Sequence, residues 1–306
     1  MLLSWQICHC VLAYRHSDTR ENTVNYTVAL AQIKPKLGCV TDNLRIIEDA
    51  VERGIQERAD LIVFPELALT GYFLKDLVPE TARPLDAPEI SRLSELSRHI
   101  DIAVGFVEVT RDFYFYNTAL YLSEGEIAHH HRKVYLPTYG LFDEQRYLAS
   151  GDRFRAFNTR LGRMGLLICE DMWHLSAPYI LAMDGATTLI CLSSSPGRGI
   201  TDAPALDSTA AWQKLTSATA MFFNSRVLYC NRVGYEDGVS FWGGSEVIDP
   251  SGSAVERGAI LAEDFVIVGI TDESLRRERI SSPLMRDENL LVTLRELTRI
   301  DRERSQ

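Results

Sequence analysis

Three segments of the chain each end on a chemically reactive residue, and this arrangement constrains the fold more than any other feature. The apolar run at 61–64 leads to Glu66, and the apolar run at 164–168 leads directly to Cys169. Between them, Lys133 follows the end of a third predicted strand. Ligands bind at strand ends in α/β sheets. The sequence therefore predicts one site that combines a carboxylate, an amine and a thiol.

Predicted strands and helices alternate along the chain. A strand at 26–32, a helix with its N-cap at Thr41 and Asp42, and the strand at 61–64 form a β-α-β unit. The same theme returns in the second half of the chain. A repeat of this kind favours an α/β sandwich of two sheets with helices outside.

The domain organisation follows from the distribution of these elements. No linker or low-complexity tract interrupts residues 26–275, which are predicted to form a single domain. Residues 1–25 are predicted to be an extension to that domain, either disordered or an artefact of the start codon. Residues 276–306 are predicted to be a C-terminal helical tail.

The bulk composition is that of a globular protein and excludes some partners. Of the 306 residues, 46% are hydrophobic and 24% are charged, and the formal net charge is -10. An acidic chain repels phosphate backbones, so no nucleic-acid partner is expected. The mildly apolar stretch at 1–14 lacks a basic start and is too short to span a membrane, so no membrane association is expected.

The six cysteines form neither a CxxC pair nor a Cys/His spacing typical of zinc. Cys39, Cys191 and Cys230 are interpreted as small buried or half-buried residues. Free thiols fit a reducing compartment, so the predicted location is the cytoplasm.

The three reactive groups together permit thiol catalysis. A thiol is a poor nucleophile until it is deprotonated, and Glu66 can act as the base. Lys133 can stabilise the thiolate and then the oxyanion, with the backbone N–H of Glu170 as a second donor. Attack of Cys169 on an amide would expel ammonia or an amine, and water would then release the acid.

Competing motifs are weak or absent from the sequence. It contains no G-x-S-x-G elbow, no S-x-x-K, no phosphate-binding P-loop and no dinucleotide fingerprint. Gly243 and Gly244 are interpreted as a turn that enters a strand. Each of the three reactive residues, taken singly, is more often structural, and only their combination favours catalysis.

Three phrases of the sequence resemble the motifs of the nitrilase (carbon–nitrogen hydrolase) superfamily. They lie at 64–72, 132–137 and 168–173, and the resemblance extends over roughly 26–272. It implies a four-layer αββα sandwich with a Glu–Lys–Cys site and with neither a metal nor an organic cofactor. It also implies homo-oligomers.

The resemblance assigns a further role to Glu144, which would position groups or shuttle protons as the second glutamate of the family does. The alternative is a loop salt bridge between Glu144 and Arg146. Within the superfamily, the phrase at 136–144 is most similar to the glutaminase domains of glutamine-dependent NAD synthetases. This similarity implies a substrate-binding shell of Tyr72, Tyr139, Trp173 and Ser195. Glu170 joins this shell through its backbone N–H, which the chemistry assigns to the oxyanion.

The predicted function is thus hydrolysis of a glutamine-like or small carboxamide to an acid and ammonia through a Cys169 thioester. An N-carbamoyl compound or a nitrile is an alternative substrate, since the triad is common to all three chemistries. Another alternative is a subunit that delivers ammonia to a separate synthetase.

Three other segments are interpreted conservatively. The run His129–His131 has no evident third ligand for a metal. Residues 194–199 are expected to form the rim of the active site rather than an anion-binding loop. The aromatic run at 113–116 is expected to pack on the sheet, with a partner surface as the alternative.

Overall fold

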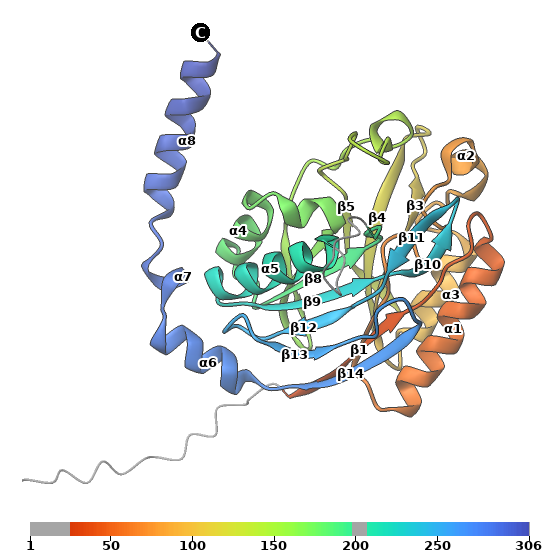
Figure 1. Cartoon of the computed structure of the whole chain (residues 1–306), viewed down its shortest axis with the longest axis horizontal. Helices are drawn as coiled ribbons and strands as arrows, with labels where there is room; N and C mark the ends of the chain where they lie inside the picture. Colours follow the sequence, from red (N-terminus) through yellow and green to blue (C-terminus); the bar gives the residue numbers. More distant parts are fainter. Residues whose placement is uncertain (1–24, 198–206, 306) are drawn as a thin grey trace, which may run out of the picture.

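The computed structural model describes residues 25–197 and 207–305, which form two six-stranded sheets packed face to face (Figure 1). In spatial order, the strands of the first sheet are β14 (Asp264–Ile270), β1 (Tyr26–Gln32), β2 (Leu61–Val63), β3 (Asp101–Val109), β4 (Phe115–Ser123) and β5 (Glu126–Arg132). Those of the second are β13 (Ala254–Arg257), β12 (Glu246–Ile248), β9 (Arg226–Asn231), β8 (Thr188–Ser193), β7 (Gly162–Ile168) and β6 (Ala156–Thr159). A separate hairpin pairs β10 (Val233–Glu236) with β11 (Val239–Trp242).

Helices cover the outer faces of both sheets. The first sheet carries α1 (Val40–Gln56) and α3 (Pro88–Leu96), and the second carries α4 (Ser176–Met183) and α5 (Asp207–Phe222). The short helices are α2 (Val78–Thr81) and the 3₁₀ turns η1 (Lys75–Leu77), η2 (Glu144–Arg146) and η3 (Cys169–Trp173).

The alternation of side chains along β1 shows how the layers are built. Val28 and Leu30 point into the core between the two sheets, whereas Ala29 and Ala31 face the helix layer. Ile47 of α1 is among the buried residues of that outer core. β1 is therefore apolar on both faces, and the predicted αββα sandwich is confirmed.

The start of α1 differs from the prediction. The helix begins at Val40, and Cys39 occupies the N-cap position without a side-chain cap. Asp42 lies inside the first turn, where a carboxylate favours the positive end of the helix, and it pairs with Lys36 at 2.8 Å. The N-cap predicted at Thr41 and Asp42 is therefore wrong.

The strand directions bring the predicted reactive residues to one edge. β1, β2 and β3 are parallel, as are β7, β8 and β9. β5 is antiparallel to β4, which is antiparallel to β3, so β5 runs in the same direction as β3. Glu66, Lys133 and Cys169 all follow the carboxyl ends of strands in this arrangement.

The C-terminal helices leave the body of the sandwich (Figure 1). They are α6 (Asp272–Ser281), α7 (Leu284–Asp287) and α8 (Leu290–Arg304). α6 spans residue 275, where the sequence analysis ended the domain. Within 25–197 and 207–305, no helix has the length and apolar character needed to cross a membrane. The predicted extension at 1–25 lies almost entirely outside the described residues.

The core between the sheets should dominate stability. Ile190, at the centre of β8, is fully buried, whereas Ile55 on α1 is 37% exposed. Replacing Ile190 by Ala should lower the free energy of unfolding by about 2–5 kcal/mol, because the lost methyl groups leave a cavity. Ile55→Ala should cost less than about 0.5 kcal/mol. Denaturant unfolding of both variants measures the difference, and equal losses would contradict this account of the core.

Candidate active site

Glu66 lies three residues beyond the end of β2 and is almost completely buried. One oxygen, Oε1, accepts hydrogen bonds from Asn117 Nδ2 at 2.7 Å and from Lys133 Nζ at 2.8 Å. The other, Oε2, accepts from the backbone N–H of Ser194 at 2.8 Å. Three donors from three different segments thus hold the carboxylate in one orientation.

Lys133 is fully buried between two carboxylates. Its Nζ lies 2.8 Å from Glu66 Oε1 and 2.7 Å from Glu144 Oε1. Burial alone would lower the pKa of Lys133, but the charges of Glu144 and Glu66 outweigh burial and raise the pKa well above its usual value. The lysine is therefore a permanent cation at the centre of the site.

Glu144 begins the 3₁₀ turn η2 and faces the site rather than the loop. Its Oε1 accepts from Lys133 and from the Tyr72 hydroxyl, and its buried Oε2 has no partner among the described residues. Burial raises the pKa of Glu144 to about 7, with Lys133 opposing the shift and Glu66 adding to it. The alternative salt bridge with Arg146 is wrong, because Arg146 lies instead against Asp143 at 3.9 Å.

Cys169 stands at the junction of β7 and the turn η3. Its φ of +45° is in the left-handed region, which a non-glycine residue rarely adopts. Ser193 Oγ lies 3.6 Å from the Cys169 sulfur. Burial and the charge of Glu66 raise the thiol pKa well above its usual value, and Lys133 opposes them. The thiol is therefore protonated in the resting protein and needs a base.

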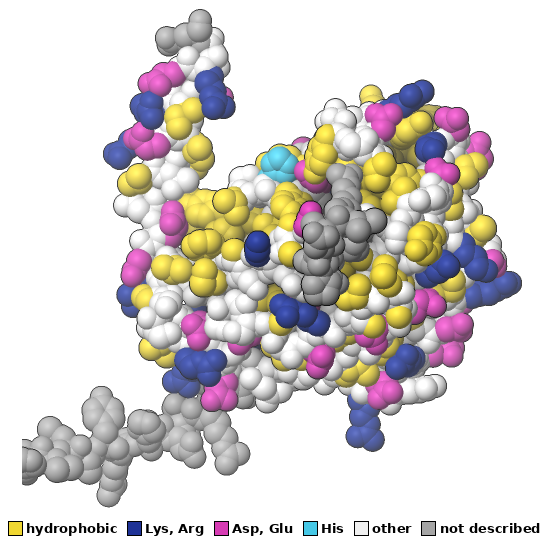
Figure 2. All heavy atoms as spheres, viewed as in Figure 1, with side chains coloured by type: hydrophobic (Ala, Val, Ile, Leu, Met, Phe, Trp, Pro, Cys, Tyr) yellow, Lys and Arg dark blue, Asp and Glu magenta, His cyan; other side chains and the backbone are white. Residues whose placement is uncertain are grey.

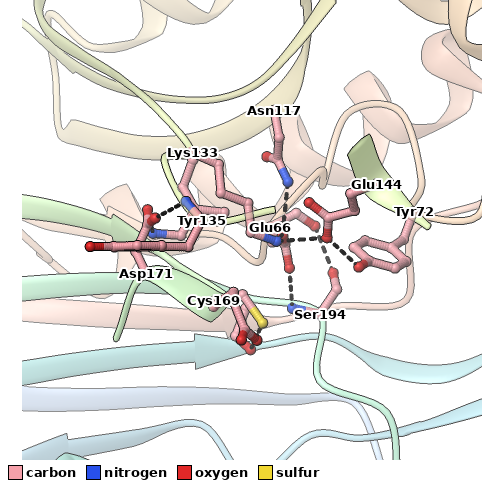
Figure 3. Close-up of polar contacts among 12 residues, drawn as sticks. Glu66, Tyr72, Asn117, Lys133, Tyr135, Glu144, Cys169, Asp171 and Ser194 are labelled. Atoms are coloured by element: carbon pink, nitrogen blue, oxygen red, sulfur yellow. Dashed lines mark hydrogen bonds and ion pairs between the residues drawn. The ribbon is translucent and has the colours of Figure 1, made fainter. Parts of the chain in front are cut away.

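Figure 3 shows these groups converging, with the Cys169 sulfur directed toward Glu66 and Ser194. Asn117 approaches Glu66 from the opposite side, and Lys133 reaches across to Glu144. The structure thus brings together all four residues predicted to carry the chemistry.

A cavity of about 290 Å³ opens onto the sulfur, which suits a small ligand. Among the predicted substrate-binding residues, those that line it are Tyr139, Glu170, Trp173 and Ser195. The Tyr139 hydroxyl donates to the Glu170 carboxylate at 2.9 Å. Ser195 Oγ accepts from Trp212 Nε1 at 2.8 Å, and the Trp212 ring packs edge-to-face with Trp173.

Tyr72 is placed differently from the prediction. It lines a neighbouring apolar cavity of about 110 Å³ and is absent from the residues around the sulfur. Its hydroxyl is occupied by Glu144. Tyr72 therefore orients the second glutamate, and the prediction that it lines the substrate pocket needs this correction.

Sequence reasoning missed several residues that hold the site. They are Asn117 and Ser194 around Glu66, Trp212 in the cavity wall, and Asp171 beside the nucleophile. Asn117 and Asp171 carried a readable signal, since each is a polar residue within or next to a buried apolar strand. Trp212 carried none, because its partner Ser195 is on a different element.

The outcome differs among the three segments for which no catalytic or metal-binding role was predicted. His131 pairs with Asp171 at 2.8 Å and His129 stacks on Phe157, and the described parts of the chain contain no His/Cys/Asp/Glu group arranged to hold a metal ion. Phe113 and Tyr114 are 80% and 60% exposed, so the expected packing of this run on the sheet is wrong for these two. Of the segment 194–199, residues 198 and 199 lie outside the described residues.

Comparisons with known proteins agree with this geometry. The Carbon-nitrogen hydrolase family matches residues 27–279. The glutamine-dependent NAD(+) synthetase of Thermotoga maritima is 32% identical over 255 residues, which are 81% of this chain and 43% of that protein. The chain spans about half the length of the curated relatives it matches.

Solved structures show the same fold. The glutamine-dependent NAD+ synthetase of Acinetobacter baumannii has a TM-score of 0.73 at 28% identity, covering 82% of this chain and 46% of that one. Nit3 of Saccharomyces cerevisiae, a nitrilase-superfamily protein, has a TM-score of 0.74 at 24% identity, covering 85% and 95%; this likeness concerns the fold alone.

The fold and site define an enzyme that acts on carbon–nitrogen bonds. The chain belongs to the carbon–nitrogen hydrolase family.

The pKa of Glu144 predicts a pH dependence. Below about pH 7 the carboxylate gains a proton and loses the negative charge that holds Lys133, so kcat/KM should fall as the pH decreases through about 7. Ammonia release from an amide, followed between pH 5 and 9, measures this acidic fall of kcat/KM. In Glu144→Gln, kcat/KM should not fall in this way near pH 7. Glu246→Gln, which changes a buried carboxylate bonded to Thr216 and Arg257, should keep the acidic fall. An unchanged acidic fall in Glu144→Gln would contradict the assignment.

Proposed function

We propose that this protein hydrolyses the carboxamide of glutamine or of a similarly small linear amide, with Cys169 as the nucleophile. The observation that carries the proposal is the buried cluster of Glu66, Lys133 and Glu144 beside a thiol in a strained turn. Each of these groups is isolated from water, where charge stabilisation is strongest.

In the first half-reaction, Glu66 takes the thiol proton as the sulfur attacks the amide carbon. The resulting oxyanion is stabilised by Lys133 Nζ and by the backbone N–H of Glu170. Glu66 then gives its proton to the amide nitrogen, and the carbon–nitrogen bond breaks. Ammonia is released, and the acyl group remains on Cys169 as a thioester.

In the second half-reaction, Glu66 removes a proton from water as the water oxygen attacks the thioester carbon. The carbon–sulfur bond breaks, the acid leaves, and the proton returns to the sulfur. Glu144 holds Lys133 in place through both steps, and its buried Oε2 can accept a proton.

Glutamine is the preferred candidate substrate for two reasons. Several relatives that this chain resembles over most of its length bear the name glutamine-dependent NAD(+) synthetase. The cavity also joins a carboxylate, Glu170, to the hydroxyl-bearing Tyr139 and Ser195, which together suit the amino-acid end of a small amide. Delivery of the ammonia to a separate synthetase is the alternative function that the names of these relatives support.

The first test is ammonia release by the purified protein. The panel contains glutamine, asparagine, short aliphatic amides, N-carbamoyl amines and nitriles. Glutamine should be turned over, and Cys169→Ala should lose all turnover because the thioester forms on the Cys169 sulfur. Glu66→Gln and Lys133→Ala should each lose about 10³-fold or more, since members of one constellation act non-additively. The matched control is Cys39→Ala. Cys39 is exposed, contrary to the expectation that it is buried or half-buried, and its replacement should keep full activity.

Each outcome of this panel has a definite meaning. Turnover that survives in Cys169→Ala would refute the proposed chemistry. Cysteine-dependent turnover of only a carbamoyl compound or a nitrile would refute glutamine as the substrate and retain the mechanism. Activity that appears only when a synthetase is added would identify an ammonia-delivering subunit.

We also propose that the protein is a cytoplasmic homo-oligomer. The four cysteines in the described ranges form no disulfide, which supports a reducing compartment. Hydrophobic side chains lie along α8 and over the neighbouring part of the body (Figure 2). The exposed ones on α4, α5 and α8 include Ile180, Met221, Phe222, Leu291, Leu294 and Leu297.

Light scattering coupled to size exclusion tests the oligomer. The measured mass should be at least twice the single-chain mass of 34.5 kDa, because exposed hydrophobic faces of this kind mark interaction surfaces. The double variant Leu291→Glu, Leu294→Glu should shift the protein toward the single-chain mass. A wild-type peak at the single-chain mass would contradict the proposal.

A further inference from the structure

We propose that Asp171 is a positioning residue that fixes the nucleophile turn relative to Lys133. This inference rests on the proposed function, in which the Cys169 sulfur and the Lys133 cation act on the same reacting atoms. Asp171 touches neither substrate nor sulfur in this account. It acts through the backbone on both sides of the site.

The contacts of Asp171 join the two halves of the site. Its carboxylate is fully buried, and Oδ1 accepts from the backbone N–H groups of Val134 and Tyr135, each at 3.0 Å. These are the two residues directly after Lys133. Oδ2 accepts from the backbone N–H of Ile168 at 3.0 Å, directly before Cys169. One carboxylate therefore connects the residues that flank the lysine and the cysteine.

These two segments belong to different sheets. Lys133 follows β5 of the first sheet, and Cys169 follows β7 of the second. Apolar packing across the interface between the sheets is non-directional. Hydrogen bonds from one carboxylate to three backbone N–H groups are directional, and the negative charge strengthens each of them.

The conformation of Cys169 explains why such a restraint is needed. A positive φ at a residue with a side chain persists only when the surroundings enforce it. The bond from Ile168 N–H to Asp171 closes the turn around the nucleophile from Ile168 to Asp171. Without it, the backbone is free to relax toward an ordinary conformation and to carry the sulfur away from Glu66 and Lys133.

His131 completes the arrangement from the first sheet. Its Nε2 lies 2.8 Å from Asp171 Oδ2, and its ring stacks on Phe154. His131 stands on β5 two residues before Lys133, so the carboxylate is held from both sides of the lysine. With this fourth bond, each oxygen of Asp171 has two hydrogen-bond donors.

The central test replaces Asp171 by Asn. The amide can still accept from Val134 and Tyr135, but its NH₂ group then faces the Ile168 N–H, so the closing bond of the turn is lost. We expect kcat to fall on the order of 100-fold with KM little changed, because a small displacement of a reacting group is this costly. The matched control is Asp101→Asn. Asp101 is almost as completely buried and bonds Tyr121, Ser123 and Arg160. It lies at the amino end of β3, whereas the site lies at the carboxyl ends of the strands.

Alkylation of Cys169 by iodoacetamide is the second readout, and it needs no substrate. The wild-type thiol is buried and should react slowly. In Asp171→Asn the loosened turn should expose the sulfur, so alkylation should accelerate while turnover falls. Both are measured well below the melting temperature of each variant. Asp101→Asn should lose melting temperature without either change.

A second pair of variants guards against misfolding of Asp171→Asn. His131→Phe keeps the ring that stacks on Phe154 but removes the donor, and turnover should fall ~10-fold for the loss of one bond to a charged group. His131→Gln restores an amide donor and should recover most of that loss. Equal activity of the two histidine variants would overturn the proposal. So would a folded Asp171→Asn with wild-type kcat and alkylation, or one whose changes match those of Asp101→Asn.

The alkylation result separates this inference from the proposed function. If no amide is hydrolysed and Cys169→Ala changes nothing, the proposed function fails. An accelerated alkylation in Asp171→Asn alone would still show that Asp171 holds the turn. If the wild type hydrolyses an amide and Asp171→Asn changes neither turnover nor alkylation, the positioning role of Asp171 is refuted and the proposed function stands.

Discussion

The ion cluster around Lys133 is the interaction on which the site depends. Burying a cation is expensive unless opposite charges and hydrogen bonds surround it. Glu66 and Glu144 supply these, and Asn117 and Ser194 complete the hydrogen bonding of Glu66. The cluster also sets the state of the thiol, because Glu66 disfavours the thiolate more than Lys133 favours it. A resting thiol beside a carboxylate is the arrangement that base-assisted attack requires.

The sandwich provides this cluster by sharing it between two sheets. Glu66 and Lys133 follow strands of the first sheet, whereas Cys169 and Ser194 follow strands of the second. The acid and the amine thus come from one sheet and the nucleophile from the other, so their alignment depends on contacts that cross between the sheets. Ser194 on Glu66 is one such contact, and Asp171 on the segment after Lys133 is another.

Much of this could be predicted from the sequence because the signals are local. An apolar run that ends close to Glu66 or Cys169 can be recognised without knowledge of the fold, and the alternation of strands and helices indicates the layers. The helix start at Val40 was missed, since Thr41 and Asp42 are residue types that favour an N-cap, whereas Cys39, which takes that position, is not. The cross-sheet contacts were missed because nothing local identifies their partners.

The same division explains why the chemistry is easier to infer than the substrate. The groups that break the bond lie at strand ends, where neighbouring apolar residues make each position recognisable. The cavity walls come from loops and from α5, and Trp212 reaches Ser195 across elements distant in the sequence. A change in one wall residue alters which amide fits without disturbing the cluster around Lys133. Closely similar clusters can therefore serve different amides, and the cavity walls are the place to look for what distinguishes them.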